Sequence, residues 1–310
     1  MFERHDTIDS PLYIVSVIYN PIRYRSRWKL YEDFKRMVEK SGAILYTAEV
    51  AFGERKFVVT EPNNPHHLQL RTTNELWLKE NIINLLIQRL PLDWKYVAWI
   101  DADVTFTRGD WANETLHQLQ HYKIIQMWTE SINLSAQYEQ IQNFKSFIWC
   151  WQNNIPNRSI DQYSVSHYWH PGYAWAITKD AYNNLGGLID WAILGGADKF
   201  MAECLTDNTK KLPNSLGSSG KKWLQQWKDR AKKYINFNIG CMDGLIIHHW
   251  HGPKADRKYQ DRGQILTEAK FDPEKDLIKD WQGLWQLNDH NAKLRDGIKK
   301  YMRGRNEDQL

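Results

Sequence analysis

The sequence is poor in cysteine and has no long apolar run. Its three cysteines, Cys150, Cys204 and Cys241, are far apart and odd in number. This excludes a fully paired disulfide framework, and the spacing fits no zinc site. Free cysteines are typical of a reducing cytosol. No apolar stretch approaches the roughly 20 residues of a membrane-spanning helix, and the first residues lack a signal-peptide pattern. We therefore expect a cytoplasmic protein with no membrane partner.

The apolar pattern predicts strands that alternate with helices. Residues 12–18 resemble a buried strand, 28–40 have helical periodicity, and 43–51 return to a strand pattern. This opening is typical of a nucleotide-binding α/β sheet. Next, Thr72 to Glu75 fit a capping box for a helix that stops at Pro91. Further strands are expected at 96–100, 123–128, 172–178 and 245–250, helices at 110–122, 197–205 and about 288–305, and a loop at 208–220.

Two carboxylates, Asp101 and Asp103, end the apolar run of residues 96–100. Side chains at i and i+2 of a strand share one face, so these two carboxylates can converge where α/β sheets bind ligands. Hard oxygen ligands at one point suit a divalent cation that bridges the phosphates of a nucleotide. The alternative interpretation is a turn with two solvated aspartates.

A second cluster carries three imidazoles in four residues, His248, His249 and His251. If the strand continues through them, His249 and His251 share a face and His248 takes the other. A neutral imidazole can complete a metal site begun by carboxylates. Lys254 and Arg257 follow closely and can neutralise phosphate oxygens. The alternative is a set of core or surface histidines.

In this order the motifs resemble those of GT-A glycosyltransferases, and more closely those of predicted GT-A enzymes from bacteria and phages. The resemblance implies an α/β fold: one GT-A-like domain with a mostly parallel, Rossmann-like central sheet flanked by helices. Within residues 1–310, about 12–128 would bind the nucleotide-sugar, about 129–270 would face the acceptor, and about 271–310 would form a helical extension. The resemblance also implies a location in the cytoplasm of a bacterium or of a phage-infected cell. The matching stretches are residues 77–84, 94–106, 170–175, 187–198 and 248–262.

The resemblance also implies roles for individual residues. Asp103 would ligate Mn²⁺ or Mg²⁺, and Asp101 would contact the ion through water or hold the donor ribose. His251, or else His249, would be the third ligand. The other expected donor contacts are Lys254 and Arg257 on the diphosphate, Lys79 facing the sugar, and Asn20 with Arg23 near the base. The expected donor is a UDP-sugar, with UDP-glucose as the default of the family.

The segment Leu194 to Asp198 resembles the Gly-Gly-Glu-Asp signature of inverting galactosyltransferases, although Ala197 stands where the family has its first acid. Asp198 would then deprotonate the acceptor hydroxyl, which makes the expected enzyme an inverting hexosyltransferase. A carboxylate in hydrogen-bond reach helps a poor alcohol nucleophile to attack. The alternative role for Asp198, a helix N-cap after a glycine turn, is compatible with this one.

Residues 208–234 carry eight basic side chains against one acid, a net charge of +7. Lys and Arg bind phosphates without regard to sequence, and aromatic rings can stack on an extruded base. We therefore expect a hydroxymethylated pyrimidine in DNA as acceptor. The alternatives are a solvated basic surface, a lid over the donor, or a glycan or small-molecule acceptor. The candidate DNA-binding residues are Lys210, Lys211, Lys221, Lys222, Trp223, Trp227, Lys228, Arg230, Lys232 and Lys233.

Two rival interpretations start from the same residues. Asp101 to Thr105 also fit the DxDxT motif of haloacid-dehalogenase-type phosphatases, in which the first Asp is the nucleophile. That family usually places the motif on its first strand and needs a later acidic pair, whereas the late cluster here is rich in histidine. A binding module without catalysis is the second rival, but binding alone needs no convergent carboxylates and imidazoles.

Overall fold

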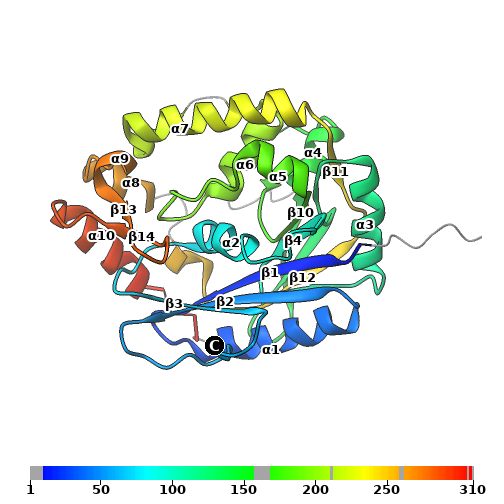
Figure 1. The fold of residues 1–310 in the computed structure, drawn as a ribbon, viewed down its shortest axis with the longest axis horizontal. Coiled ribbons are helices and arrows are strands. Elements are labelled where there is room, and N and C mark those ends of the chain that lie inside the picture. Colours follow the sequence, from blue (N-terminus) through cyan, green and yellow to red (C-terminus); the bar gives the residue numbers. More distant parts are fainter. Residues whose placement is uncertain (1–9, 157–167, 210–211, 258–261, 306, 309–310) are drawn as a thin grey trace, which may run out of the picture.

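The fold is built on a twisted central sheet with helices on both sides (Figure 1). The computed structural model describes residues 10–156, 168–209, 212–257, 262–305 and 307–308. Within these ranges the sheet has seven strands in the order β11, β6, β10, β4, β1, β2, β3, and β10 alone runs antiparallel to its neighbours. Their bounds are β1 Leu12–Tyr19, β2 Ile44–Phe52, β3 His67–Thr72, β4 Tyr96–Ile100, β6 Ile124–Gln126, β10 Ala174–Thr178 and β11 Ile239–Cys241.

This topology confirms the predicted α/β class with a mostly parallel central sheet flanked by helices. The helices, in chain order, are α1 Arg25–Lys40, α2 Lys79–Ile87, α3 Trp111–His121, α4 Phe147–Gln152, α5 Lys179–Leu185, α6 Ala197–Leu205, α7 Gly217–Arg230, α8 Arg262–Glu268, α9 Pro273–Asp276 and α10 Ala292–Arg303, with shorter turns η2 Asn214–Leu216, η3 Ala231–Ile235 and η4 Lys254–Arg257. No helix in the described part of the chain has both the length and the apolar character needed to cross a membrane.

Strand β1 is covered on both faces, because its side chains alternate between two apolar layers. Tyr13 and Val15 pack into the core on the side of α2, whereas Leu12 and Ile14 pack into the core on the side of α1. All of β1 except Val17 is buried. A continuous apolar run of this kind is what a central parallel strand needs, and it explains why β1 was recognisable in the sequence.

A second sheet brings the late histidines to the central sheet. Its order is β5, β12, β7, β8, β9, and β12 pairs antiparallel with β5, which directly follows the two aspartates. In this register His248 lies opposite Val104, and the His249 amide donates to the Asp103 carbonyl at 2.9 Å. The bounds are β5 Val104–Phe106, β7 Glu130–Leu134, β8 Gln140–Ser146, β9 Trp169–His170 and β12 Leu245–His248; a separate hairpin joins β13 Leu277–Lys279 to β14 Trp285–Leu287.

Two local expectations were wrong. The helix predicted after Thr72 begins only at Lys79, because Thr72 ends β3 and Trp77 donates its amide to the Ile193 carbonyl instead of joining a helix. The loop predicted at 208–220 ends early, since α7 already begins at Gly217. The cap of α7 comes from a distant residue: Asp272 Oδ2 accepts the Ser218 and Ser219 amides at 3.0 Å. A local sequence pattern contains no sign of such a cap.

Asp272→Ala is therefore expected to lower the free energy of unfolding by about 2 kcal/mol, because it leaves the first amides of α7 without their acceptor. Burial raises the pKa of Asp272, but hydrogen bonds from Ser219, Ser218 and the Glu274 amide outweigh it and lower the pKa to about 2. A carboxyl normally titrates near 4. The stabilisation is thus full above about pH 4 and is lost as pH falls toward 2. Urea denaturation at pH 7 and pH 3 measures both effects.

Asp229→Ala is the matched control, because Asp229 is exposed near the other end of α7. Its removal should change stability by less than about 0.5 kcal/mol. Equal losses in the two variants would contradict a special role for Asp272.

Candidate active site

A cavity of about 780 Å³ lies at the edge of the central sheet where β1 and β4 end. These strands are parallel, so the residues that follow Tyr19 and Ile100 meet at the same edge. Its volume is in the range of small-molecule sites. Most of the sequence-predicted site residues line it: Asn20, Lys79, Asp101, Asp103, Asp198, His249, His251 and Arg257.

Two predicted residues stand apart from this cavity. Arg23 does not line it; its guanidinium lies 5.1 Å from the ring centre of Trp28, beside a small separate hollow. Lys254 begins η4, but its side chain lies outside the described part of the structure. Asn20 lines the cavity and uses its amide to hold both backbone groups of Tyr24, at 2.8 and 2.9 Å.

One carboxylate and two imidazoles form a group suited to a metal ion. Ligand atoms of Asp103, His248 and His251 all lie within 4.8 Å of one another. Asp103 Oδ2 is 3.4 Å from His251 Nε2, and Asp103 Oδ1 is 3.8 Å from His248 Nε2. Asp103 Oδ1 is buried and accepts no hydrogen bond among the described residues. A buried acceptor of this kind requires a partner, and a cation between the three ligands provides one.

The hydrogen bonds of His251 keep it ready to bind a metal. Its Nδ1 lies 2.9 Å from the carbonyl oxygen of His249, which can only accept, so Nδ1 carries the proton and Nε2 presents its lone pair toward Asp103. Burial, with the positive charge of Arg257, holds the pKa of His251 well below its ordinary value. The ring is therefore neutral near pH 7, as a ligand must be.

The structure brings His248, and not His249, into this group. β12 ends at His248, so strand alternation does not continue to His251. His249 still lines the cavity, but its Nε2 lies 2.9 Å from the hydroxyl of Thr105. Sequence reasoning missed His248 because it assumed a strand through residue 250.

Asp101 forms an ion pair with Lys79, the first residue of α2. Burial raises the pKa of Asp101, while the neighbouring ammonium opposes the rise. Burial lowers the pKa of Lys79, but Asp101 and Glu80 outweigh it and the net pKa is raised, so the ammonium stays charged. Lys79 and Asp101, which were predicted in separate roles toward the donor, are thus paired, and Asp101 lies outside the group of Asp103, His248 and His251.

Glu80 is a buried acid in the same wall that the sequence did not single out as a candidate. It is 5% exposed and lines the cavity. Burial, together with Asp198, raises its pKa to about 7 despite the opposing charge of Lys79. Its only signal in the sequence was its position next to Lys79.

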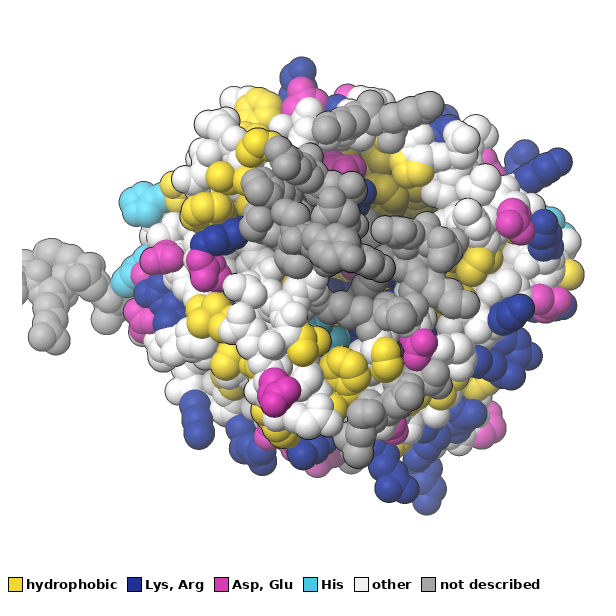
Figure 2. All heavy atoms as spheres, turned by 180° about the vertical axis from the view of Figure 1, so that it is seen from behind, with side chains coloured by type: hydrophobic (Ala, Val, Ile, Leu, Met, Phe, Trp, Pro, Cys, Tyr) yellow, Lys and Arg dark blue, Asp and Glu magenta, His cyan; other side chains and the backbone are white. Residues whose placement is uncertain are grey.

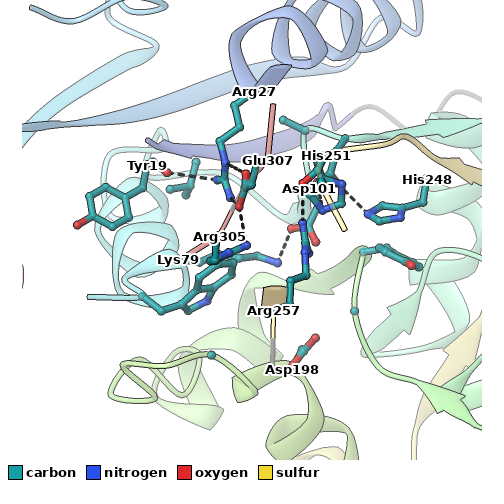
Figure 3. A pocket seen from close by; sticks show the side chains of 18 of the residues that line it. Tyr19, Arg27, Lys79, Asp101, Asp198, His248, His251, Arg257, Arg305 and Glu307 are labelled. Carbon is teal, nitrogen blue, oxygen red and sulfur yellow. Dashed lines mark hydrogen bonds and ion pairs between the residues drawn. The ribbon is translucent and has the colours of Figure 1, made fainter. Parts of the chain in front are cut away.

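Asp198 lies in the first turn of α6, on the side of the cavity away from His248 and His251 (Figure 3). Gly195 and Gly196 precede the helix with φ of 81° and 94°, which glycine adopts without strain. A Cβ at Gly172 would lie 2.9 Å from Asp198 Oδ2, so a larger residue there would displace the carboxylate. The helix cap is Gly196, so Asp198 is not the N-cap residue, but its Oδ1 accepts the backbone amide of Lys199 in the same first turn at 2.8 Å.

Aromatic rings line the wall beside the histidines. The ring of Tyr173 stacks on His170 with 4.1 Å between centroids and lies 4.6 Å from the ring of His248 on its other side. Tyr173 has φ of 80°, unusual for a non-glycine residue, and its hydroxyl donates to Asn133 at 3.0 Å. A strained aromatic residue thus supports a member of the Asp103, His248 and His251 group.

The cavity contains a further pair of basic side chains that was not predicted from the sequence. Arg27 in α1 and Arg305, just after α10, both line the cavity and both pair with Glu307 (Figure 3). These residues are far apart in the sequence, and no motif connects them. Only the packing of α10 reveals that they meet.

The basic segment of residues 208–234 differs most from its predicted role as a DNA-binding surface. Trp227 is 3% exposed and donates to the Gly187 carbonyl at 2.9 Å, and Trp223 packs against the core. The Trp227 ring is therefore not available to stack on a base, whereas the Trp223 ring is only partly buried. Lys228 pairs with Asp207, and Arg230 donates to the Leu185 carbonyl. Lys222, Lys232 and Lys233 are exposed and Lys221 is half-buried, while Lys210 and Lys211 lie outside the described residues.

On the face in Figure 2, Lys and Arg side chains are scattered around the rim with Asp and Glu between them. The predicted stacking role of Trp227 is wrong, because its ring is buried and donates to the Gly187 carbonyl.

No protein-family model and no curated protein matches the sequence. Similar solved structures include the catalytic domain of Drosophila β1,4-galactosyltransferase 7 with xylobiose, at 9% identity and a TM-score of 0.34, covering 65% of this chain and 63% of that one. A mutant of the same enzyme with manganese, UDP-Gal and xylobiose aligns at 10% identity and a TM-score of 0.40, over 93% and 98%.

A third similar solved structure is that of a synthase. The 4-diphosphocytidyl-2C-methyl-D-erythritol synthase of Anaerococcus prevotii has 12% identity and a TM-score of 0.33, over 76% of this chain and 89% of that one. The match to the first galactosyltransferase structure spans less than two thirds of it. Likenesses this loose identify no activity, so function is inferred from the site itself.

His248→Ala should weaken Mn²⁺ binding by about tenfold or more, because it removes a ligand from a set of three. His249→Ala, the neighbouring control, should change the affinity less than about threefold, since its ring bonds to Thr105. Titration calorimetry with Mn²⁺ measures both. Loss of binding in His249→Ala alone would contradict the ligand set of Asp103, His248 and His251.

Proposed function

We propose that the protein is a metal-dependent glycosyltransferase that moves a sugar from a nucleotide-sugar donor to an acceptor hydroxyl. One observation carries this proposal: the Asp103, His248 and His251 group shares a cavity with guanidiniums and with the separate carboxylate of Asp198. A cation site, positive charge for a diphosphate and a base for an alcohol are what sugar transfer needs.

The ligand set favours Mn²⁺ or Mg²⁺. A carboxylate oxygen suits both ions, and two imidazoles favour Mn²⁺ over Mg²⁺. Asp103, His248 and His251 would hold the ion, which would supply positive charge against the departing diphosphate. Lys79 neutralises Asp101, which lies outside this group.

The donor is proposed to be a UDP-sugar. Arg257 lies against the metal group, where its Nη2 donates to the His251 carbonyl at 3.4 Å, and its charge opposes the rise in the pKa of both aspartates. It is therefore well placed to bind the diphosphate, and Lys254 begins the same turn. Asn20 lines the cavity and is proposed to contact the base, whereas Arg23 lines only the separate small hollow. UDP-glucose remains the default donor.

Asp198 is proposed as the catalytic base. It accepts the proton of the acceptor hydroxyl while that oxygen attacks the anomeric carbon, and the bond from this carbon to the diphosphate oxygen breaks. The nucleoside diphosphate leaves with the bonding electron pair. Attack from the side opposite the leaving group inverts the anomeric configuration.

The haloacid-dehalogenase alternative has less support. That chemistry completes its metal site with later acids, whereas the residues that join Asp103 here are His248 and His251. Asp101, the nucleophile of that mechanism, is held by Lys79.

Asp198→Asn should lower kcat about 10²- to 10⁴-fold with little change in donor affinity, because the amide cannot accept the proton. The assay supplies Mn²⁺ and a panel of UDP-sugars, and follows nucleotide release with and without acceptor. Glu203→Gln on the same helix is the control, since Glu203 does not line the cavity. Unchanged turnover in Asp198→Asn would exclude this base, and no release from any UDP-sugar would exclude the proposed donor class.

The acceptor is proposed to be a hydroxymethylated pyrimidine in DNA, with a glycan or small-molecule hydroxyl as the alternative. Charge is the main support for DNA, because Trp227 is buried and Trp223 is partly buried. If DNA binds, its affinity should fall steeply between low and physiological salt through counterion release. Lys222, Lys232 and Lys233 are exposed, so the change of each one to Gln should weaken DNA binding. Fluorescence anisotropy with hydroxymethylated DNA tests this, and absence of binding at low salt would leave the glycan or small-molecule acceptor.

A further inference from the structure

A carboxylate from beyond α10 lies between two guanidiniums inside the cavity. Arg27 holds Glu307 through Nε and Nη2, the latter at 2.7 Å, and Arg305 Nη2 holds the same carboxylate at 2.8 Å (Figure 3). All three residues line the cavity that contains the metal group. The two guanidiniums thus form an anion-binding site, and a carboxylate of the same chain occupies it.

The cations outnumber the carboxylate. Three guanidiniums, Arg27, Arg257 and Arg305, act on the one carboxylate of Glu307. Asp103 offsets one further charge of this group, because Arg257 and Arg27 act on it too, so the cations still exceed the carboxylates by one. Burial raises the pKa of Glu307, but these guanidiniums outweigh it and lower the pKa to about 2. Burial and the neighbouring charges of Arg257 and Arg27 lower the pKa of Arg305. Cations crowded in this way favour an incoming ligand with more negative charge than one carboxylate.

Arg305 also has hydrogen-bonding capacity to spare. It is 4% exposed, its guanidinium lies 5.3 Å from the ring centre of Trp77, and its Nε donates to no acceptor among the described residues. A buried donor without a partner costs about 1–3 kcal/mol in general. A ligand with more oxygen atoms than Glu307 can satisfy it.

We infer that Arg27 and Arg305 form a binding site for the diphosphate of the donor, and that Glu307 occupies this site until the diphosphate replaces it. This inference rests on the proposed function. Two guanidiniums present paired donors that match phosphate oxygens, and Asp103 lies close enough for the charges of Arg27 and Glu307 to act on it. A diphosphate held here would share the cavity with the Asp103, His248 and His251 group.

The exchange needs little movement of the fold. Asp308, the next residue, accepts the backbone amides of Arg25 and Ser26 at 2.8 and 2.9 Å and so anchors the segment at the start of α1. Arg305 is held on its other side by Trp77. Glu307 therefore lies between two fixed points, and rotation of its side chain is enough to vacate the guanidiniums.

Inorganic pyrophosphate is the probe, titrated by calorimetry at pH 7 with EDTA so that no metal takes part. Glu307→Gln should bind pyrophosphate about tenfold more tightly than the unchanged protein, because the amide does not compete for the guanidiniums. Arg305→Gln should bind about tenfold more weakly, because it removes paired donors. Glu75→Gln is the control: it breaks a comparable ion pair with Arg303, at 2.8 Å, but Glu75 does not line the cavity. The pyrophosphate affinity of this control should stay within about twofold of that of the unchanged protein.

Pyrophosphate affinity in Glu307→Gln that is equal to or weaker than normal would overturn the inference and make Glu307 a structural ion pair. If that variant does not fold, NMR of the Glu307 side-chain carboxyl in the unchanged protein decides. Pyrophosphate should shift the ¹³C signal of this carboxyl, because the carboxyl leaves both guanidiniums, and an unchanged signal would overturn the inference.

The outcome is separable from that of the proposed function. Exchange of Glu307 for pyrophosphate without sugar transfer would leave the anion site standing and remove the glycosyltransferase. Sugar transfer without this exchange would support the glycosyltransferase and exclude the replacement of Glu307 by a diphosphate.

Discussion

The pairing of β12 with β5 is the constraint on which the site depends. β5 starts one residue after Asp103, so its register fixes the late histidines against the early aspartates, although about half the chain separates them. The parallel pair β1 and β4 then adds the loop of Asn20 to the same edge. If this register slipped by one residue, His248 would turn away from Asp103, because strand side chains alternate.

Much of the fold could be predicted from local patterns. Leu12–Tyr19 is apolar throughout because both of its faces are covered, and Ala197–Leu205 was predicted with its bounds because two glycines mark its start. The failures have a common cause. The start of α7 depends on Asp272, and that of α2 on a backbone bond to Ile193, and both partners are remote in the sequence.

The site was predictable where one motif supplies the chemistry and not where two segments meet. Asp103 and His251 were identified, since each stands out within its own short motif. His248 was assigned to the wrong face, because the end of β12 is set by its neighbours and not by its own residues. Arg27, Arg305 and Glu307 had no signal, as their meeting follows from where α10 packs. The stacking role predicted for Trp223 and Trp227 rested on composition, which cannot distinguish a ring packed in or against the core from a surface ring.

The candidate ligands for a metal ion come from both sheets. Asp103 follows β4 of the central sheet, while His248 and His251 come from the end of β12 in the other. An ion bound there would act as a cross-link between the two layers, and its binding energy would be shared with the cohesion of the fold by mass-action linkage. Binding of the ion and the relative alignment of the two sheets are thus thermodynamically coupled. A change remote from the cavity that loosens the junction of the sheets would therefore also lower the affinity for the ion.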